Sequence, residues 1–215
     1  GNGSDTEFTA KEAADALYYM SLAGWDANQS MTGLPAVLDL ATAAGMELSL
    51  ASDIVTDSLT AFGLKAEDAS SFCDVLAKTS ASSNTTVEML GEAFKNVAPL
   101  AGAMGYNVSE VSLALGLMAN AGIKSSESGN KLKSILANLA KPTADCAAAM
   151  EEYNISLTNS DGTAKPFIEV LGDLRQAFSN LDEVQQAELA TTIAGKLNMA
   201  GLLASLIQVK KILIN

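Results

Sequence analysis

The sequence predicts an all-α protein, a multi-helix bundle of helix-turn-helix units, with a small β-hairpin left open near residues 155–165. Two observations favour helices. The chain is 48 % apolar but only 5 % aromatic, so its apolar mass is mostly Ala, Leu, Val and Met, which suit helices packed through small side chains. Apolar residues also recur at helical spacing between capping residues and glycines. At 215 residues the chain is long enough to bury a large core.

The first two expected helices have clear start and stop signals. Thr9 and Glu12 have the spacing of a capping box, and Gly24 can end the helix that they open. The second helix is expected to begin at about Pro35, because proline is favoured in the first turn of a helix. Gly45 is expected to end it.

The third and fourth expected helices each carry one apolar face. Gly63 ends the third, and the fourth repeats its pattern a few residues later. The two faces consist of Ala51, Ile54, Val55, Leu59 and Phe62, and of Ala69, Phe72, Cys73, Leu76 and Ala77.

The fifth and sixth expected helices follow the same logic. Residues 85–88 read Thr-Thr-Val-Glu, which predicts another capping box, and Pro99 is expected to kink the last turns of the fifth helix. Asn107 or Ser109 starts the sixth helix, which Gly122 ends.

The spacing of apolar residues changes once in the C-terminal part of the chain. A seventh helix ends before Pro142, and an eighth covers residues 143–153. Residues 155–158 alternate between apolar and polar side chains, as in a strand. Residues 159–162 are of types that favour turns, and residues 163–165 could form a return strand.

Helices are expected to resume after this segment. One starts at Pro166, and Asp182 with Gln185 can cap the next. A final apolar stretch covers residues 198–214.

Three regions follow from this pattern. Residues 1–10 are expected to form a flexible N-terminus, and its first residues could be non-native. Residues 11–142 are expected to form a helical core, and residues 143–215 a C-terminal helical segment with the hairpin. A shift of 42 positions aligns Ala-Phe-Gly-Leu at 61–64 with Ala-Met-Gly-Tyr at 103–106, which indicates two similar helix-turn-helix units. Because the chain lacks an initiator Met, it is interpreted as a segment of a longer protein.

The expected core and cap residues can be named. Gly63, Gly105 and Gly122 should lie just past helix ends in the left-handed conformation. The side chains expected in the core are Trp25, Phe62, Phe72, Phe94, Leu115 and Leu136.

The composition argues against catalysis and against cofactors. There is no histidine, which removes the commonest general base and metal ligand. Cys73 and Cys146 are interpreted as buried free thiols, with a disulfide left open. The carboxylate pairs Asp53 with Asp57 and Glu151 with Glu152 are helical neighbours on solvated faces, not groups that converge on a cleft. We therefore expect no enzyme and no catalytic, cofactor-binding or metal-binding residue.

Charge and hydropathy exclude two further classes of protein. The net charge of −12 leaves no basic patch for a nucleic-acid backbone, so direct nucleic-acid binding is not expected. The uncharged residues 96–109 and 111–123 are separated by Glu110 and interrupted by Pro99, so a buried helical hairpin is favoured over a membrane span.

Several blocks of the sequence resemble the conserved core region of phage tail tape-measure proteins. These blocks are AGWDA at 23–27, LDLA at 38–41, SDIVTDSLTAFGL at 52–64, FCDVLAKTSASSNTTVEMLGEAFKNVAPLAGAMGY at 72–106, GLMANAGIKSSESGNKLKSILANLAKPT at 116–143, ISLTNSDGTAKPF at 155–167 and GDLRQAF at 172–178. The resemblance covers residues 11–207, and its more specific parts are Asn-Ala-Gly-Ile-Lys at 120–124 and Leu-Ala-Lys-Pro-Thr at 139–143. Residues 128–133 depart from the family, which reads Ala-Gly-Thr before a Leu-Arg pair, and residues 208–215 match no part of it.

The resemblance implies a non-catalytic, structural role in tail assembly, tail-length determination and genome delivery. Proteins of this family thread the lumen of a long tail, set its length during tube polymerisation and leave the tube ahead of the DNA. It implies tail-tube proteins, tail-assembly proteins and tail chaperones as partners, and membrane contact by the parent protein during infection. It also implies a place in the tail lumen of the virion, after synthesis in the bacterial host cytoplasm.

Two other functions stay open on the residues alone. A helical-repeat adaptor or scaffold that binds a protein partner would have the same helical pattern. A membrane-active segment would use the apolar residues 96–123 and 197–214.

Overall fold

The computed structural model describes residues 8–203. The expectations for residues 1–7, and for the part of the final apolar stretch after residue 203, lie outside the described residues. The helices within that range are α1 (Ala10–Leu22), α2 (Ala27–Ala44), α3 (Leu48–Phe62), η1 (Ala66–Asp68), α4 (Ala69–Ser82), α5 (Val87–Ala103), α6 (Val108–Asn120), α7 (Ser125–Ala140), α8 (Ala144–Glu152), α9 (Phe167–Phe178) and α10 (Glu183–Ala194). The all-α prediction is confirmed.

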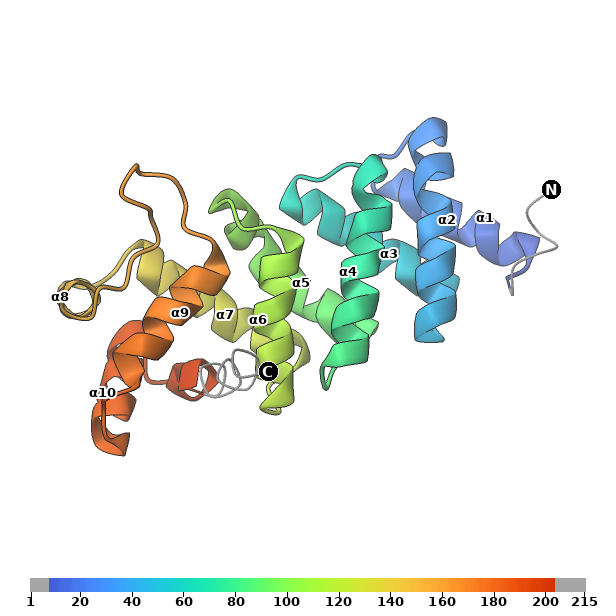
Figure 1. Cartoon of the computed structure of the whole chain (residues 1–215). Coiled ribbons are helices and arrows are strands. Elements are labelled where there is room, and N and C mark those ends of the chain that lie inside the picture. The colour runs from blue at the N-terminus through green and yellow to red at the C-terminus, as the bar shows by residue number, and fades with distance from the viewer. Residues whose placement is uncertain (1–7, 204–215) are drawn as a thin grey trace.

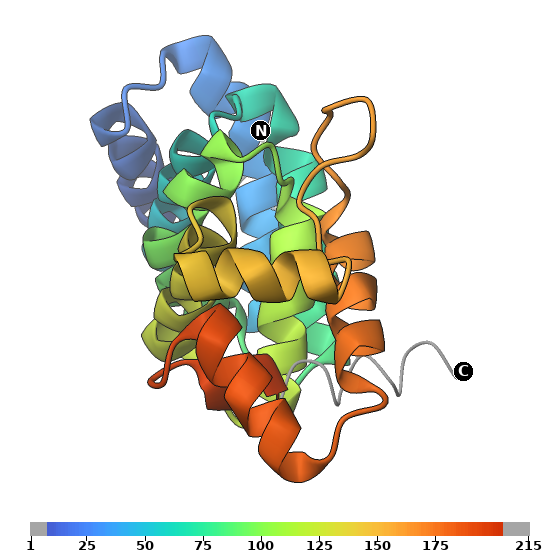
Figure 2. The same ribbon diagram turned by 90° about the vertical axis from the view of Figure 1, so that its left-hand side faces the viewer.

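The helices form two layers. Helices α1, α3, α5 and α7 stack one against the next in a first layer, and α2, α4 and α6 do so in a second. Figure 1 shows the second layer as a row of parallel ribbons in front, which α9 continues beside α6. In Figure 2, α8 and α10 lie across the end of this stack, where α10 contacts both α7 and α8. Each helical hairpin thus contributes one helix to each layer, as in α-solenoid repeats.

The first layer is held together at glycines. A Cβ atom on Gly129 of α7 would lie 2.2 Å from the carbonyl oxygen of Ala93 on α5, and one on Gly91 of α5 would lie 2.8 Å from Ile54 on α3. Only residues without a side chain let helices approach this closely, because real interiors leave no room for such an overlap. The small residues of the sequence therefore set the spacing of this layer.

The second helix begins earlier than the sequence predicts. Asp26 is its N-cap: the Gln29 N–H donates to Asp26 at 2.8 Å, and the Asp26 N–H donates to Gln29 at 2.9 Å. Pro35 therefore lies inside α2, and the predicted start at this proline is wrong. The missing N–H of Pro35 leaves the Met31 carbonyl without its helical donor, and both residues are exposed, so water can bond that carbonyl.

Most other helix boundaries follow the prediction. The predicted capping box at residues 85–88 is wrong: the N-cap is Thr86, whose side chain accepts the N–H of Met89 at 3.1 Å, and the methionine side chain cannot accept the return bond that completes a box. Gly63, Gly105 and Gly122 have φ of +69°, +86° and +89°, which confirms the left-handed prediction at all three.

The core contains four of the six side chains that the sequence predicts. Phe72, Phe94, Leu115 and Leu136 are at most 2 % exposed. Trp25 and Phe62 are only half-buried, so their prediction as core residues is wrong. Both lie at helix ends: Trp25 packs over Gly33 of α2, and the ring of Phe62 meets that of Phe94 edge-on at 5.5 Å.

Candidate interaction surfaces

The acidic side chains are spread over several helices. Asp53 and Asp57 share one face of α3, where burial and then the charge of Asp53 raise the pKa of Asp57. A hydrogen bond to Glu92 raises the pKa of Lys95, which lies on the facing α5. Within residues 8–203 no three Asp, Glu or Cys side chains gather closely enough to hold a metal ion. The environment of Asp57 thus disfavours its charged form, whereas Glu92 favours the charged form of Lys95.

Both cysteines are free and buried, as predicted. Burial, followed by the charges of Asp74 and Asp39, raises the pKa of the Cys73 thiol to about 12. Burial also raises the pKa of Cys146. A thiol needs a lowered pKa and access to solvent to act as a nucleophile, so these two are packing residues.

A long groove runs between α4 and α6 in the second layer. It has two sections, of about 450 Å³ and 470 Å³, which share Val75 and Ser109 in their linings. Its lining combines apolar side chains with hydroxyl and amide groups and with one acidic and one basic side chain. The polar lining residues include Ser71, Thr79, Ser83, Asn107 and Asn120 and the charged Asp68 and Lys78. Such a lining can hold a protein segment through apolar contacts and hydrogen bonds.

One buried hydroxyl lies in the wall of this groove. Ser112 of α6 is 1 % exposed, and its Oγ has no hydrogen-bond partner among the described residues. Gly116 lies one turn further along α6, and a Cβ atom there would lie 2.6 Å from the Oγ of Ser83. The sequence pattern predicted the helices but not this groove, because a groove depends on how far apart α4 and α6 lie.

The turn before α6 is tied to the start of α9. The carboxylate of Glu110 accepts the N–H of Asn107 at 2.9 Å, which completes the capping box of α6. Its other oxygen accepts the N–H of Phe167, the first residue of α9, at 2.7 Å. The rings of Tyr106 and Phe167 lie beside this bond with centroids 5.1 Å apart. One carboxylate therefore caps two helices that are far apart in the sequence.

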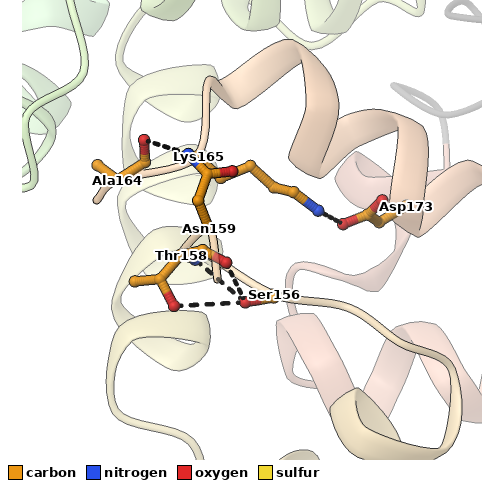
Figure 3. Close-up of polar contacts among 6 residues, drawn as sticks. All are labelled: Ser156, Thr158, Asn159, Ala164, Lys165 and Asp173. Atoms are coloured by element: carbon orange, nitrogen blue, oxygen red, sulfur yellow. Dashed lines mark hydrogen bonds and ion pairs between the residues drawn. The ribbon is translucent and has the colours of Figure 1, made fainter. Parts of the chain in front are cut away.

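The segment before α9 forms the turn that the sequence predicts, with one antiparallel bridge between Thr158 and Ala164. The N–H of Gly162 donates to the carbonyl of Asn159 at 3.0 Å. Figure 3 shows the base of this loop, where Ser156 accepts the N–H of Thr158 at 3.1 Å. There, too, Lys165 forms an ion pair with Asp173 of α9. These contacts fix the loop against the end of the stack.

An exposed apolar face lies at the opposite end of the stack. Tyr18 and Leu22 of α1 are 62 % and 65 % exposed, and Met31 of α2 is 62 % exposed. The sequence analysis named none of these three side chains. The signal was present as large apolar residues on the polar side of an amphipathic helix.

Comparison with known proteins identifies the family. The sequence profile of the phage-related minor tail proteins matches residues 2–195, which is nearly the whole chain. The chain belongs to this family. The resemblance to tail proteins that the sequence blocks suggested is therefore confirmed.

Individual relatives of this family carry the tape-measure name. The chain is 36 % identical over 204 residues to the tape measure protein of Pneumococcus phage Dp-1. This alignment covers 95 % of this chain and 18 % of that protein. It is 26 % identical over 196 residues to the probable tape measure protein of Escherichia phage P2. That alignment covers 90 % of this chain and 24 % of the relative. The chain thus spans about a fifth to a quarter of the length of these relatives. No solved structure matches it significantly.

No helix in the described part of this family member is both long and apolar enough to cross a membrane. The uncharged residues 96–109 and 111–123 form the end of α5, the turn after it, α6 and the turn after α6, and nine of the 13 residues of α6 are buried. The predicted buried hairpin is confirmed there.

Proposed function

We propose that this chain is a folded module of a phage tail tape-measure protein, and that the parent protein acts in tail assembly, tail-length determination and genome delivery. The observation that carries the proposal is the alignment with a tape measure protein over 95 % of the chain. The role is structural, and the module works through contacts with other proteins.

The module itself is not the ruler that measures the tail. The longest helix of the described residues, α2, has 18 residues and is therefore only about 27 Å long at 1.5 Å per residue. Even all 215 residues in one continuous helix would span only about 320 Å. The parts that match this chain make up 18 % and 24 % of the two relatives, so we assign the measuring role to other segments of the parent protein.

We propose tail-tube proteins, tail-assembly proteins and tail chaperones as partners, and the tail lumen of the virion as the place of the parent protein. The groove between α4 and α6 supports a protein partner, because its apolar, hydroxyl and amide lining suits a peptide or helix. The net charge of −12 disfavours a direct contact with DNA.

Duplication of the module in the parent gene tests this assignment. If it stays folded in the tail, a second copy should change the tail length, measured by electron microscopy, by no more than a few tens of Å, about the size of one helix. An increase near 290 Å, the length of 196 residues in helical form at about 1.5 Å per residue, would show that this segment is stretched and measures the tail.

Disruption of the fold in the same gene tests the need for the module. Gly129→Leu inserts a side chain where α5 and α7 touch and should abolish normal tails. Gly172→Ala on α9 is the matched control, since a Cβ atom there meets no other atom within 4 Å. Tails of normal number and length in the Gly129 variant would contradict an assembly role for this module.

A further inference from the structure

The described chain ends beside one end of the groove between α4 and α6. A Cβ atom on Gly201 would lie 3.7 Å from the Cδ1 atom of Ile123, in the turn after α6. Leu202 is only 1 % exposed, so the last described turn is packed in place. Figure 1 shows this turn beside the lower end of α6. Asn120, the last residue of α6, lines the groove at the same end, so the residues that follow Leu203 begin close to it.

The groove leaves part of its lining incompletely satisfied by the described residues. Four of its apolar side chains are only half-buried, namely Phe62, Leu64, Val75 and Leu113. The Oγ atom of Ser112 is buried in the wall and has no hydrogen-bond partner within residues 8–203. Apolar surface is stabilised when another segment covers it, and a buried hydroxyl is stabilised when that segment bonds it.

The charges of the lining follow one another along the groove. The section of about 470 Å³ begins at Asn120 and carries Lys78, whereas the section of about 450 Å³, at the other end, carries Asp68. A segment that enters at Asn120 therefore passes a positive charge first and a negative charge last. Such a segment fits if its first residues are uncharged and its later residues are basic.

The C-terminal segment, residues 204–215, has this order of charges. It reads Ala-Ser-Leu-Ile-Gln-Val-Lys-Lys-Ile-Leu-Ile-Asn, so its first six residues are uncharged and Lys210 and Lys211 follow. It contains no acidic residue. Half of the segment consists of large apolar residues that can cover the groove, namely Leu206, Ile207, Val209, Ile212, Leu213 and Ile214.

We propose that residues 204–214 of the same chain lie in the groove between α4 and α6, extended and antiparallel to α6. The length of the segment fits. Helix α6 has 13 residues and is about 20 Å long, whereas residues 204–211 span up to about 26 Å when extended. Lys210 and Lys211 can therefore reach the section that carries Asp68. The segment is also rich in β-branched residues, which favour an extended backbone.

The walls of the groove suit an extended segment. Such a segment presents free backbone N–H and C=O groups along its edges, and the hydroxyls and amides of the walls can bond them. Ser112 is one of these groups. The inference goes beyond the proposed function and does not depend on it: a partner protein could use the groove only after the segment has left it.

Hydrogen exchange of the full chain, followed by mass spectrometry, tests the proposal. The amides of residues 206–214 should exchange at least about tenfold more slowly than those of a synthetic peptide of the same sequence, because the groove bonds and covers them. Ser109→Trp fills the groove where its two sections meet and should remove this protection. The matched control is Ser70→Trp, at an exposed serine of α4 that lines neither section.

The control should leave the exchange of residues 206–214 unchanged. Circular dichroism verifies that both variants are folded. A parent protein without protection in the segment, protection that survives Ser109→Trp, or equal losses in both variants would overturn the proposal.

A pair of neutral substitutions tests the order of charges. Asp68→Asn keeps an acceptor for the N–H of Lys65, which Asp68 bonds at 2.9 Å, but removes the negative charge of the groove. It should speed the exchange of residues 206–214 by about two- to fivefold, since partly exposed ion pairs contribute modestly. Glu67→Gln, at the exposed neighbouring position outside the groove, should have no effect. Equal effects of the two substitutions would contradict the proposed direction.

A nitroxide label on Asn215→Cys tests the place and the source of the segment. It should broaden the amide signals of residues 68–72 and 107–110, at the end of the groove that carries Asp68, with little effect on α1 at the far end of the stack. The native thiols are buried and stay unlabelled. When nitroxide-labelled protein is mixed with isotope-labelled protein that lacks the nitroxide, the same signals should stay sharp. Broadening in the mixture would show that the groove holds the segment of a second copy, and no broadening in the labelled chain itself would show that the groove is not covered; either result would overturn the proposal.

Discussion

Gly129 of α7 lies against the backbone of Ala93 on α5 so closely that a Cβ atom on Gly129 would be 2.8 Å from the Cα atom of Ala93 and 2.2 Å from its carbonyl oxygen. The two helices make the most extensive contact in the stack at this place. The obstacle is backbone, which cannot rotate away as a side chain would. The position therefore tolerates glycine and no larger residue.

Gly129→Ala should lower the free energy of unfolding by about 2–3 kcal/mol, the upper range for overpacking, because α7 must move away from α5. Gly172→Ala on α9 is the matched change at an open helical position and should leave stability unchanged or raise it by up to about 1 kcal/mol through helix propensity. Urea unfolding followed by circular dichroism measures both. Equal effects of the two substitutions would show that the close contact is absent in solution.

Gly122→Val should destabilise the protein by about 1–2 kcal/mol, because Gly122 has φ of +89° and a β-branched residue is strained in the left-handed region. No atom lies within 4 Å of a Cβ there, so strain and not overlap is the cause. Gly122→Asn should cost less, since asparagine tolerates this conformation. Thermal unfolding checks this order: the unfolding midpoint should be highest for the parent protein, lower for Gly122→Asn and lowest for Gly122→Val.

Glu110→Ala should cost about 2–4 kcal/mol, because it removes the acceptor of two hydrogen bonds. The partly buried bond from Phe167 is worth roughly 1.5–3 kcal/mol when one partner is charged, and the exposed bond from Asn107 contributes less. Glu12→Ala is the matched control: Glu12 completes a capping box with Thr9 but bonds no second helix, so its loss should be clearly smaller. Urea unfolding measures the difference, and hydrogen exchange at the start of α9 should rise only in the Glu110 variant.

The protein should lose stability in alkaline solution. Burial, and then the charge of Glu110, raises the pKa of Tyr106 to about 12 from an ordinary value of 10.0. A raised pKa of the folded state means that the folded protein keeps a proton that the unfolded chain releases, so stability falls as the pH rises from about 10 to 12. Cys73 acts in the same sense from about pH 9, its ordinary pKa being 9.0.

Tyr106→Phe should reduce this alkaline loss, since phenylalanine has no proton to release. The measurement is the urea midpoint at several pH values between 8 and 11, with the slope above pH 10 compared between the two proteins. Phe replaces the ring that packs on Phe167, so stability near pH 8 should change little. An identical pH dependence in both proteins would contradict the assigned cause.

The local chemistry of the sequence determined most helix ends. The residues that mark these ends bond or bend the backbone within a few positions of themselves, so their effect can be predicted from the sequence alone. They are Asn107 with Glu110, Asp182 with Gln185, and the glycines that end α3, α5 and α6. The same reasoning failed at Pro35, where a favourable first-turn residue competed with the stronger capping box at Asp26. Local signals of this kind depend on neighbouring backbone groups, and the strongest one in reach decides the boundary.

The sequence by itself determined that this protein is a chain of short amphipathic helices with no histidine, since periodicity and residue chemistry are properties of neighbours along the chain. Only the tertiary structure decided that odd and even helices separate into two layers, that Gly129 meets Ala93, and that Glu110 reaches Phe167. These contacts join residues 36 and 57 positions apart. They depend on how whole helices pack, and many distant residues set that packing together.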